Sequence, residues 1–231
     1  MILEAKNVLY SYKSKRDKII LKNVSATFEE ATFYAIVGSS GSGKTTFLSL
    51  LAGLDNPVSG TILYNGENIR KKGLNYHRRH DISLVFQNYN LIDYLTTEEN
   101  VKLGGKKDAE KLLQEVSIPR EDWKRNVLQL SGGQQQRVAI ARALASEAKV
   151  LLADEPTGNL DSKSGQTVIE ALEHINQEMG KTIVMVTHDP QMASHCSRIL
   201  FLKDGQVLED LRKTGTTEMF YKQILEHMKM L

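Results

Sequence analysis

The segment at residues 38–45, GSSGSGKT, constrains the fold of this chain more than any other. It satisfies every fixed position of the pattern G-x-x-x-x-G-K-[ST]. An apolar run at 33–37 precedes it, and a run typical of a helix follows at 46–52. Strand, glycine-rich loop and helix in this order are the context in which the pattern binds phosphate. We therefore predict a phosphate-binding loop rather than a glycine-rich turn without a ligand.

The loop has the chemistry needed to hold the phosphates of a nucleotide. Its glycines let backbone N–H groups wrap a phosphate without Cβ clashes, and the helix behind it adds unpaired donors and a positive dipole end. Lys44 is predicted to reach the β- and γ-phosphates, and the Thr45 hydroxyl to bind Mg²⁺. The predicted nucleotide contacts here are Gly38, Ser39, Ser40, Gly41, Ser42, Gly43, Lys44, Thr45 and Thr46.

The composition is ordinary for a soluble globular protein, with 231 residues of which 41% are hydrophobic and 25% charged. A net charge of +2 gives no argument for nucleic-acid binding. No apolar run approaches the roughly 18 residues that span a bilayer, and residues 1–6 do not resemble a secretory signal. The single cysteine, Cys196, suits a reducing cytosol and is expected to be a small buried side chain rather than a catalytic thiol.

Apolar strands alternate with helical segments, which predicts an α/β fold with a largely parallel core sheet. Hairpins at 61–69, with an Asn65-Gly66 turn, and at 199–208 are expected to add antiparallel strands. Residues 88–130 are different in character. They are turn-rich and contain a helix that Asp108 can cap, so they predict a small helical insert in which Trp123 packs.

Three other segments leave alternatives open. Tyr10 and Tyr12 are expected at the sheet edge, although an exposed tyrosine there could stack on a base. The basic stretch at 77–80 is expected to be a solvated loop rather than a phosphate or metal site. Residues 217–231 predict an amphipathic helix that packs back on the domain rather than docking elsewhere.

Polar side chains follow several predicted strands, where ligands bind in open α/β sheets. They are Gln87, Asp154, Glu155 and His188. Asp154 is suited to hold Mg²⁺ through water, Glu155 to orient or deprotonate a water, and His188 to donate a hydrogen bond to a γ-phosphate. Because phosphoryl transfer needs mainly positioning and charge neutralisation, this set is sufficient for it.

The chain contains a second helix that begins with glycines, and a single active site gives this helix start no role. Ser131, Gly132 and Gly133 open a strong helix, so they offer either a second anion seat or an ordinary helix cap.

Residues 130–134, LSGGQ, continued by QQR at 135–137, resemble the signature motif of the ATP-binding subunit of an ABC transporter. The resemblance covers nearly the whole chain. It implies that Tyr12 stacks on the base, that residues 38–45 are Walker A, and that Asp154 is the Walker B carboxylate. It also implies that Glu155 is the catalytic base, that His188 is the switch histidine, and that Gln87 contacts Mg²⁺ and couples to the membrane subunit.

The resemblance further implies a homodimer with two ATP molecules sandwiched head to tail. In this arrangement the signature of one chain caps the γ-phosphate held by the other. The residues implied across the dimer are Ser131, Gly132, Gly133, Gln134 and Asp161, and those implied at Mg²⁺ are Thr45, Gln87 and Asp154, the last through water.

Residues 153–161, ADEPTGNLD, resemble the branch with macrolide exporters, lipoprotein-release and division-linked transporters, and bacitracin-type resistance transporters. Residues 187–190, 193–196 and 201–206 look closest to the bacitracin type. The stretch from Gln87 to Ser131 is shorter than this branch usually has, which predicts the loss of a helix or loop near Gly104-Gly105.

These observations predict one ABC ATPase domain over residues 1–231, with an ATP-binding core at 1–87 and 146–231 and a helical subdomain at about 88–145. The expected function is ATP hydrolysis that powers a separate integral membrane permease, for export of or resistance to antimicrobial peptides or other amphiphiles. The expected place is the cytoplasmic side of a bacterial cell membrane, held through the permease, with no membrane insertion and no nucleic acid. The alternatives are a soluble ABC-type ATPase in DNA repair or translation, and a nucleotide kinase or GTPase.

Overall fold

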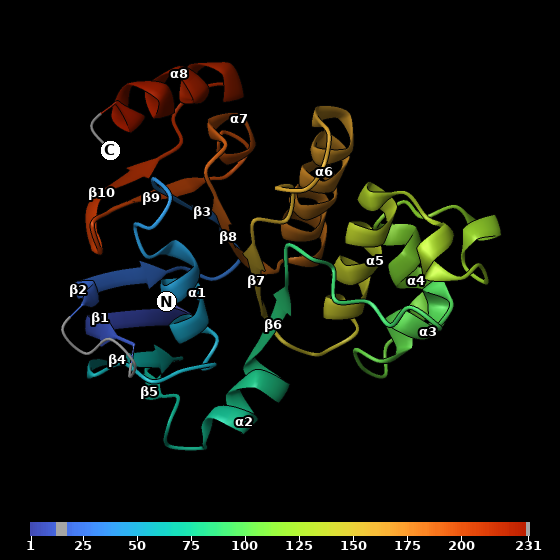
Figure 1. Ribbon diagram of the computed structural model, residues 1–231, viewed down its shortest axis with the longest axis horizontal. Helices are drawn as coiled ribbons and strands as arrows, with labels where there is room; N and C mark the ends of the chain where they lie inside the picture. Colours follow the sequence, from blue (N-terminus) through green and yellow to red (C-terminus); the bar gives the residue numbers. More distant parts are fainter. Residues whose placement is uncertain (13–17, 230–231) are drawn as a thin grey trace.

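A mainly parallel sheet forms the centre of the molecule (Figure 1). The computed structural model describes residues 1–12 and 18–229. Neighbouring strands of this sheet lie in the order β10-β9-β3-β8-β7-β6. Their bounds are β3 Phe33–Val37, β6 Ile82–Val85, β7 Val150–Asp154, β8 Thr182–Thr187, β9 Arg198–Lys203 and β10 Gln206–Arg212. Every neighbouring pair is parallel except β9 and β10, which are antiparallel. The predicted α/β fold with a largely parallel sheet is confirmed.

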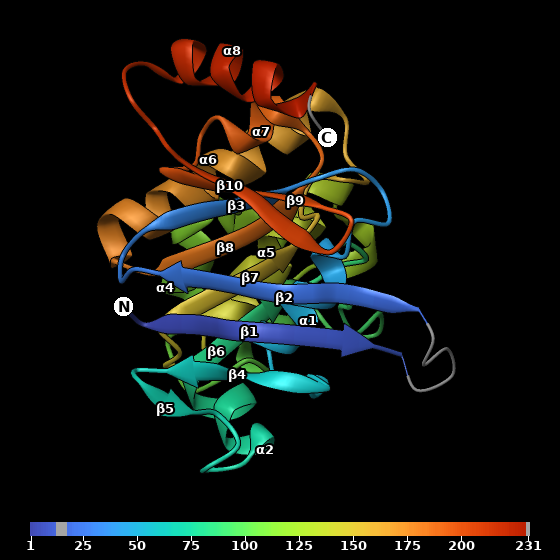
Figure 2. The same cartoon turned by 90° about the vertical axis from the view of Figure 1, so that its left-hand side faces the viewer.

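An antiparallel sheet in the order β2-β1-β4-β5 lies in front of the core sheet in Figure 2. Its strands are β1 Leu3–Ser11, β2 Ile19–Phe28, β4 Ser59–Tyr64 and β5 Glu67–Asn68. Asn65 (φ 48°) and Gly66 (φ 78°) join β4 to β5, and both have the positive φ that a type I′ turn requires. The added antiparallel part is therefore confirmed. Of the charged stretch KSKRDK at 13–18, only Lys18 lies within the described residues.

The central sheet is buried on both faces, as its near-continuous apolar strands predict. Side chains of β3 alternate between two hydrophobic cores, with Phe33, Ala35 and Val37 in one and Tyr34 and Ile36 in the other. This alternation is the period of two that a strand imposes.

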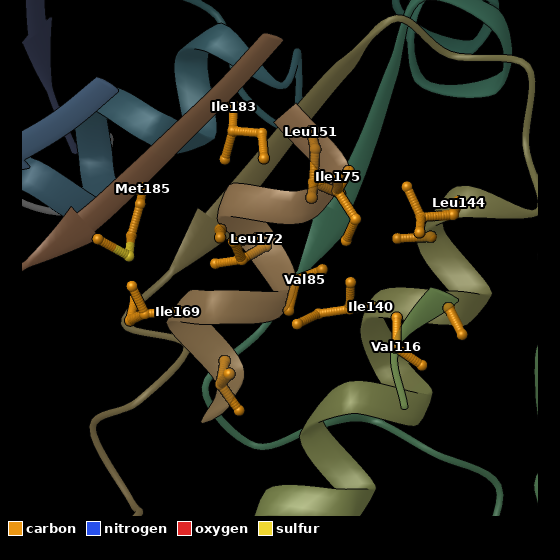
Figure 3. Packing of buried hydrophobic residues seen from close by; sticks show 14 of the residues in the cluster. Val85, Val116, Ile140, Leu144, Leu151, Ile169, Leu172, Ile175, Ile183 and Met185 are labelled. Atoms are coloured by element: carbon orange, nitrogen blue, oxygen red, sulfur yellow. The ribbon is translucent and has the colours of Figure 1, made fainter. Parts of the chain in front are cut away.

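The two cores pack the sheet against different partners. One core joins it to α5 (Gly132–Leu144) and α6 (Ser162–Met179), and Leu151 of the sheet belongs to this core together with Ile140 and Leu172 (Figure 3). The other core joins it to α1 (Lys44–Leu51) and to the antiparallel sheet. The helix that follows the phosphate-binding loop is thus enclosed between the two sheets.

A group of helices stands to one side of the sheet, in green and yellow in Figure 1. It contains α3 (Thr97–Lys102), α4 (Ala109–Glu115) and α5, which pack on one another, and short 3₁₀ turns at Arg120–Asp122 and Val127–Gln129. Asp108 caps α4 as predicted, and Trp123 is 6% exposed, so it packs the insert. The exact division at 88–145 stays a prediction.

Gly104 and Gly105 connect α3 to α4 across the C-terminal end of α5. A Cβ on Gly104 would lie 1.8 Å from the carbonyl oxygen of Arg142, and one on Gly105 would lie 2.1 Å from that of Ala145. Only glycine permits so close an approach of two backbones. The connection is therefore tight, while the loss of a helix or loop here stays a prediction.

The prediction of a solvated loop at 77–80 is wrong for His77. Residues His77–Asp81 form a π-helical turn after α2 (Leu74–Tyr76), and His77 is only 1% exposed. Its Nδ1 lies 3.0 Å from Asp81 Oδ2, and its Nε2 lies 3.0 Å from the carbonyl oxygen of Leu51 at the end of α1. Carbonyls at a helix end need partners, and this one is distant in sequence, so the local pattern did not reveal it. Arg79 and His80 are exposed, as expected.

The C-terminal helix α8 (Thr217–Met228) packs on α7 (Pro190–Ala193), as predicted. Phe220 and Ile224 are fully buried, and the predicted end of the helix at 230–231 lies outside the described residues.

Cys196 is also fully buried, and this burial raises the pKa of its thiol. Among residues 1–12 and 18–229, no helix has the length and apolar character needed to cross a bilayer.

We expect Phe220→Ala to lower the free energy of unfolding by about 3–5 kcal/mol, because it leaves a cavity where a fully buried ring stood. Urea denaturation followed by circular dichroism measures the change. The matched control is Met219→Ala, whose side chain is 57% exposed and whose loss should change stability by less than about 0.5 kcal/mol. Equal effects of the two variants would mean that α8 does not pack as described.

Candidate nucleotide-binding site

The predicted polar residues follow four adjacent strands of the core sheet, β3, β8, β7 and β6. These strands are parallel, so their carboxyl ends meet at one edge. The phosphate loop follows β3, His188 follows β8, and Asp154 and Glu155 end β7. Gln87 follows β6. The fold thus brings segments far apart in sequence to one place.

Backbone geometry makes glycine necessary at two positions of the loop. A Cβ on Gly38 would lie 2.2 Å from the carbonyl oxygen of Leu202. Gly43 has φ 104°, and a Cβ there would lie 2.8 Å from Leu21 Cδ2. The sequence pattern therefore reflects packing as well as space for a ligand.

Lys44 is buried at the start of α1, with 6% of the residue exposed. Its ammonium group faces the loop. It donates hydrogen bonds to the carbonyl oxygens of Gly38 (2.9 Å) and Ser39 (3.0 Å). Burial lowers the pKa of Lys44, while the charges of Glu155 and Asp154 act in the opposite direction. With three donors and two protein acceptors, the ammonium retains a donor for a phosphate oxygen.

The Thr45 hydroxyl donates a hydrogen bond of 2.9 Å to Asp154 Oδ1. Burial raises the pKa of Asp154, and the bond from Thr45 partly offsets this. A hydroxyl and a carboxylate are the oxygen ligands that Mg²⁺ takes in proteins, so the pair fits that ion.

Glu155 is held in an uncommon backbone conformation with φ 43°. Its N–H donates to the carbonyl oxygen of Val186, and its Oε2 lies 3.3 Å from Nδ1 of His188. A left-handed conformation in a residue other than glycine costs free energy, so the surrounding structure must hold it in place. The carboxylate and the imidazole are thus adjacent, at the ends of neighbouring strands.

These groups surround a hollow with a volume of about 580 Å³. Its wall includes Ser40, Gly41, Gly43, Lys44, Thr45, Thr46, Glu155 and His188 together with Tyr12, Lys18 and Ile20. Lys18 and Ile20 were missed from sequence. The basic loop after Tyr12 was the only available signal for Lys18.

The two tyrosines near the N-terminus differ in environment. Tyr10 is 4% exposed and donates a 2.5 Å hydrogen bond to Asp55, so it packs on the sheet as expected. Tyr12 is 46% exposed, lines the hollow, and shares a 2.9 Å hydrogen bond with the Thr46 hydroxyl. Tyr12 also packs against Tyr10, with the two ring centroids 5.2 Å apart, and the exposed part of its ring is available to a ligand.

Gln87 is turned toward the segment after β7. Its Nε2 donates to Asn159 Oδ1 (3.1 Å), and Asn159 Nδ2 donates back to the Gln87 carbonyl oxygen (3.3 Å). Asn159 was not predicted as a partner, since no local pattern links positions so far apart. Within the described residues, Gln87 does not belong to the wall of the hollow.

The signature residues form a separate helix start. Ser131 caps α5, and its partner in the capping box is Gln134. Asp161 caps α6 through the N–H groups of Lys163 and Ser164, and its bonds to Ser164 lower its pKa. In the described part of the chain, neither group lines the hollow. One chain thus carries a nucleotide hollow and, apart from it, a second glycine-lined helix end.

Fold and loop together define a phosphate-loop nucleotide-binding protein. The family described as "ABC transporter" matches residues 21–158. The chain belongs to this family, and the resemblance drawn from residues 130–134 is confirmed. It is an ATP-binding ATPase of the branch that the sequence indicated.

The chain is similar over its full length to known proteins. ABC transporter ATP-binding protein YxdL of Bacillus subtilis is 41% identical, with 100% of this chain and 94% of that protein covered. Bacitracin export ATP-binding protein BceA of Halalkalibacterium halodurans is 38% identical, with 100% and 96% covered.

A solved structure is also similar. It is the dimeric post-hydrolysis state of the cassette MJ0796 of Methanocaldococcus jannaschii, bound to ADP and Pi. Its TM-score is 0.81 at 39% identity, with 93% of this chain and 100% of that chain covered.

We expect Lys44→Ala to reduce ATP hydrolysis by about a hundredfold or more, because it removes the charge that compensates the phosphates. Phosphate release at saturating ATP measures the loss, and thermal unfolding checks that the fold is retained. The matched control is Lys22→Ala, at an exposed position on β2. Hydrolysis at the wild-type rate in Lys44→Ala would refute the site.

Proposed function

We propose that this chain is the ATP-hydrolysing subunit of a transporter whose membrane permease is a separate chain. The observation that carries the proposal is the presence, in one chain, of a nucleotide hollow and a separate glycine-lined helix end that does not reach it. Two copies arranged head to tail would bring each helix end to the hollow of the other. The dimeric structure of the similar cassette MJ0796 supports this arrangement.

In this proposal the hollow binds ATP through contacts of three kinds. Tyr12 stacks on the base, with its ring exposed beside Thr46. The N–H groups of the loop at 38–45 and the Lys44 ammonium hold the phosphates. Thr45, Asp154 through water, and Gln87 would hold Mg²⁺, which would supply charge neutralisation at the phosphates. For this, Gln87 would exchange its hydrogen bond with Asn159 for a contact with the ion.

Glu155 and His188 carry out the chemical step. Glu155 accepts a proton from the water whose oxygen attacks the γ-phosphorus, and the bond from that phosphorus to the bridging oxygen breaks to give ADP and phosphate. His188 donates a hydrogen bond to a γ-phosphate oxygen. Their separation of 3.3 Å in the free chain allows Glu155 to orient the imidazole.

The second helix end completes the site across the dimer. Ser131, Gly132, Gly133 and Gln134 would face the γ-phosphate held by the other chain, and Asp161 would lie beside it. Because positioning supplies most of the rate in phosphoryl transfer, hydrolysis would then require the dimer.

The transported substrate is proposed from the relatives. BceA is described as a bacitracin export protein, which favours a peptide or another amphiphile as the substrate of the permease. The chain would then act at the cytoplasmic face of a bacterial membrane, held there by the permease. A soluble ABC-type ATPase in DNA repair or translation is less favoured, because such proteins carry long coiled-coil insertions. In the described interval between the phosphate loop and β7, the longest helix is α5, with 13 residues.

We expect Glu155→Gln to trap an ATP-bound dimer, because the substitution removes the base and leaves the phosphate contacts intact. Size-exclusion chromatography with ATP and Mg²⁺ should show a dimer, and hydrolysis should fall by about a hundredfold or more. Glu178→Gln, at an exposed position of α6, is the control and should behave as wild type. A monomeric Glu155→Gln protein under these conditions would refute the head-to-tail dimer with ATP bound between the two copies.

We also expect an integral membrane protein to co-purify with the tagged chain from detergent-solubilised membranes of its own cells. Mass spectrometry identifies it, and an untagged preparation is the control. If only soluble proteins accompany the chain, the transport role is wrong and the soluble alternative gains support.

A further inference from the structure

The glycine-lined start of α5 is held by a reciprocal pair of hydrogen bonds. The Ser131 hydroxyl accepts from the Gln134 N–H (3.3 Å), and Gln134 Oε1 accepts from the Ser131 N–H (2.9 Å). This capping box satisfies two of the donors that every helix start leaves unpaired. The N–H groups of Gly132 and Gly133 stay available for an external anion.

A buried carboxylate decides which way the Gln134 amide faces. Gln134 Nε2 donates a 2.8 Å hydrogen bond to Asp122 Oδ2. The two ends of an amide are nearly equal in shape, so its orientation follows from its partners. Because an ionised carboxylate only accepts, the NH₂ group must face Asp122 and the carbonyl must face Ser131.

Asp122 is itself fixed in place. It is 5% exposed, and its Oδ1 accepts a 2.8 Å hydrogen bond from Arg125 Nη1. The next residue, Trp123, is buried and donates from its indole to the carbonyl oxygen of Ile118 (2.9 Å). Both oxygens of the carboxylate are therefore used, and its backbone is anchored in the helical insert.

We propose that Asp122 is a positioning residue for ATP hydrolysis across the dimer. It acts through Gln134, whose amide it orients so that the capping box aims the Gly132 and Gly133 N–H groups at the γ-phosphate of the partner's ATP. The proposal rests on the proposed function, since it gives these N–H groups their ligand. A purely structural role would stabilise the helical insert without affecting the dimer.

Asp122→Asn tests the proposal. The new side chain has one acceptor oxygen for two donors, and that oxygen must face Arg125, because an NH₂ group there would oppose the donors of a charged guanidinium. Its NH₂ group then faces Gln134, so either the bond to Gln134 is lost or the Gln134 amide turns and breaks the capping box. ATP binding to the single chain, measured with a fluorescent nucleotide, should be unchanged. The rate of ATP turnover and the ATP-dependent dimer should fall by about five- to tenfold, the effect of losing one helix cap.

A swap of the two chemical groups supplies the decisive comparison. Gln134→Glu alone places two carboxylates together and brings a negative charge to the helix start, so turnover should fall by at least as much. In the double variant Asp122→Asn with Gln134→Glu, the amide lies at 122 and the carboxylate at 134, so the hydrogen bond is restored in reverse. The carboxylate can still accept from the Ser131 N–H, as in the S-x-x-E form of the capping box. Turnover should therefore be about fivefold higher than in Gln134→Glu alone, a comparison in which both proteins carry the same charge at position 134.

The control is Glu121→Gln, which removes the same charge from the exposed neighbouring position and should change nothing. Wild-type turnover in Asp122→Asn, or equal turnover in the double variant and in Gln134→Glu alone, overturns the proposal. If Asp122→Asn does not fold, the comparison of the double variant with Gln134→Glu decides alone, and no gain in the double variant overturns the proposal. If Glu155→Gln traps a dimer while Asp122→Asn keeps wild-type turnover, the role of Asp122 is wrong and the proposed function still holds.

Discussion

The placement of β3 between β8 and β9 is the constraint on which the nucleotide site depends. Val37, the last residue of β3, pairs with Thr187 on one side and Phe201 on the other. The chain that leaves β3 therefore turns at the same level as the chain that leaves β8. It passes the Leu202 carbonyl so closely that only glycine fits at position 38. The register of buried apolar strands thus sets the position of the polar loop.

The charged groups Lys44 and Asp154 at the nucleotide site are only partly balanced by other groups of the chain. Burial lowers the pKa of Lys44 and raises the pKa of Asp154, so each is pushed toward its neutral form. A polyphosphate with its cation would supply the opposite charge that each group lacks. The groups are already fixed by hydrogen bonds from Lys44 to the loop and from Thr45 to Asp154, which reduces the reorganisation needed when nucleotide binds.

The sequence predicted the features that depend on local pattern. The strands, the loop at 38–45, the type I′ turn at Asn65-Gly66 and the cap at Asp108 all follow from short-range rules. The sequence did not predict contacts between distant segments. His77 is buried because a carbonyl at the end of α1 needs a donor, and Gln134 is oriented by a carboxylate in a different turn. Tyr10 and Tyr12 are two residues apart, yet only the fold shows that one is packed and the other faces the hollow.

The helical insert links the parts of the site that lie outside the hollow. At one end of α5, Asp122 holds the start of the helix through Gln134. Near the other end, the Arg142 guanidinium donates to the carbonyl oxygens of Tyr89 and Asn90, just after Gln87. A helix moves nearly as a rigid body, so α5 connects the segment after Gln87 with Gly132 and Gly133. In the proposed head-to-tail dimer, a partner that displaced this segment would also displace the helix start that faces the other chain's nucleotide. The coupling role that family resemblance implies for Gln87 would then have a physical route.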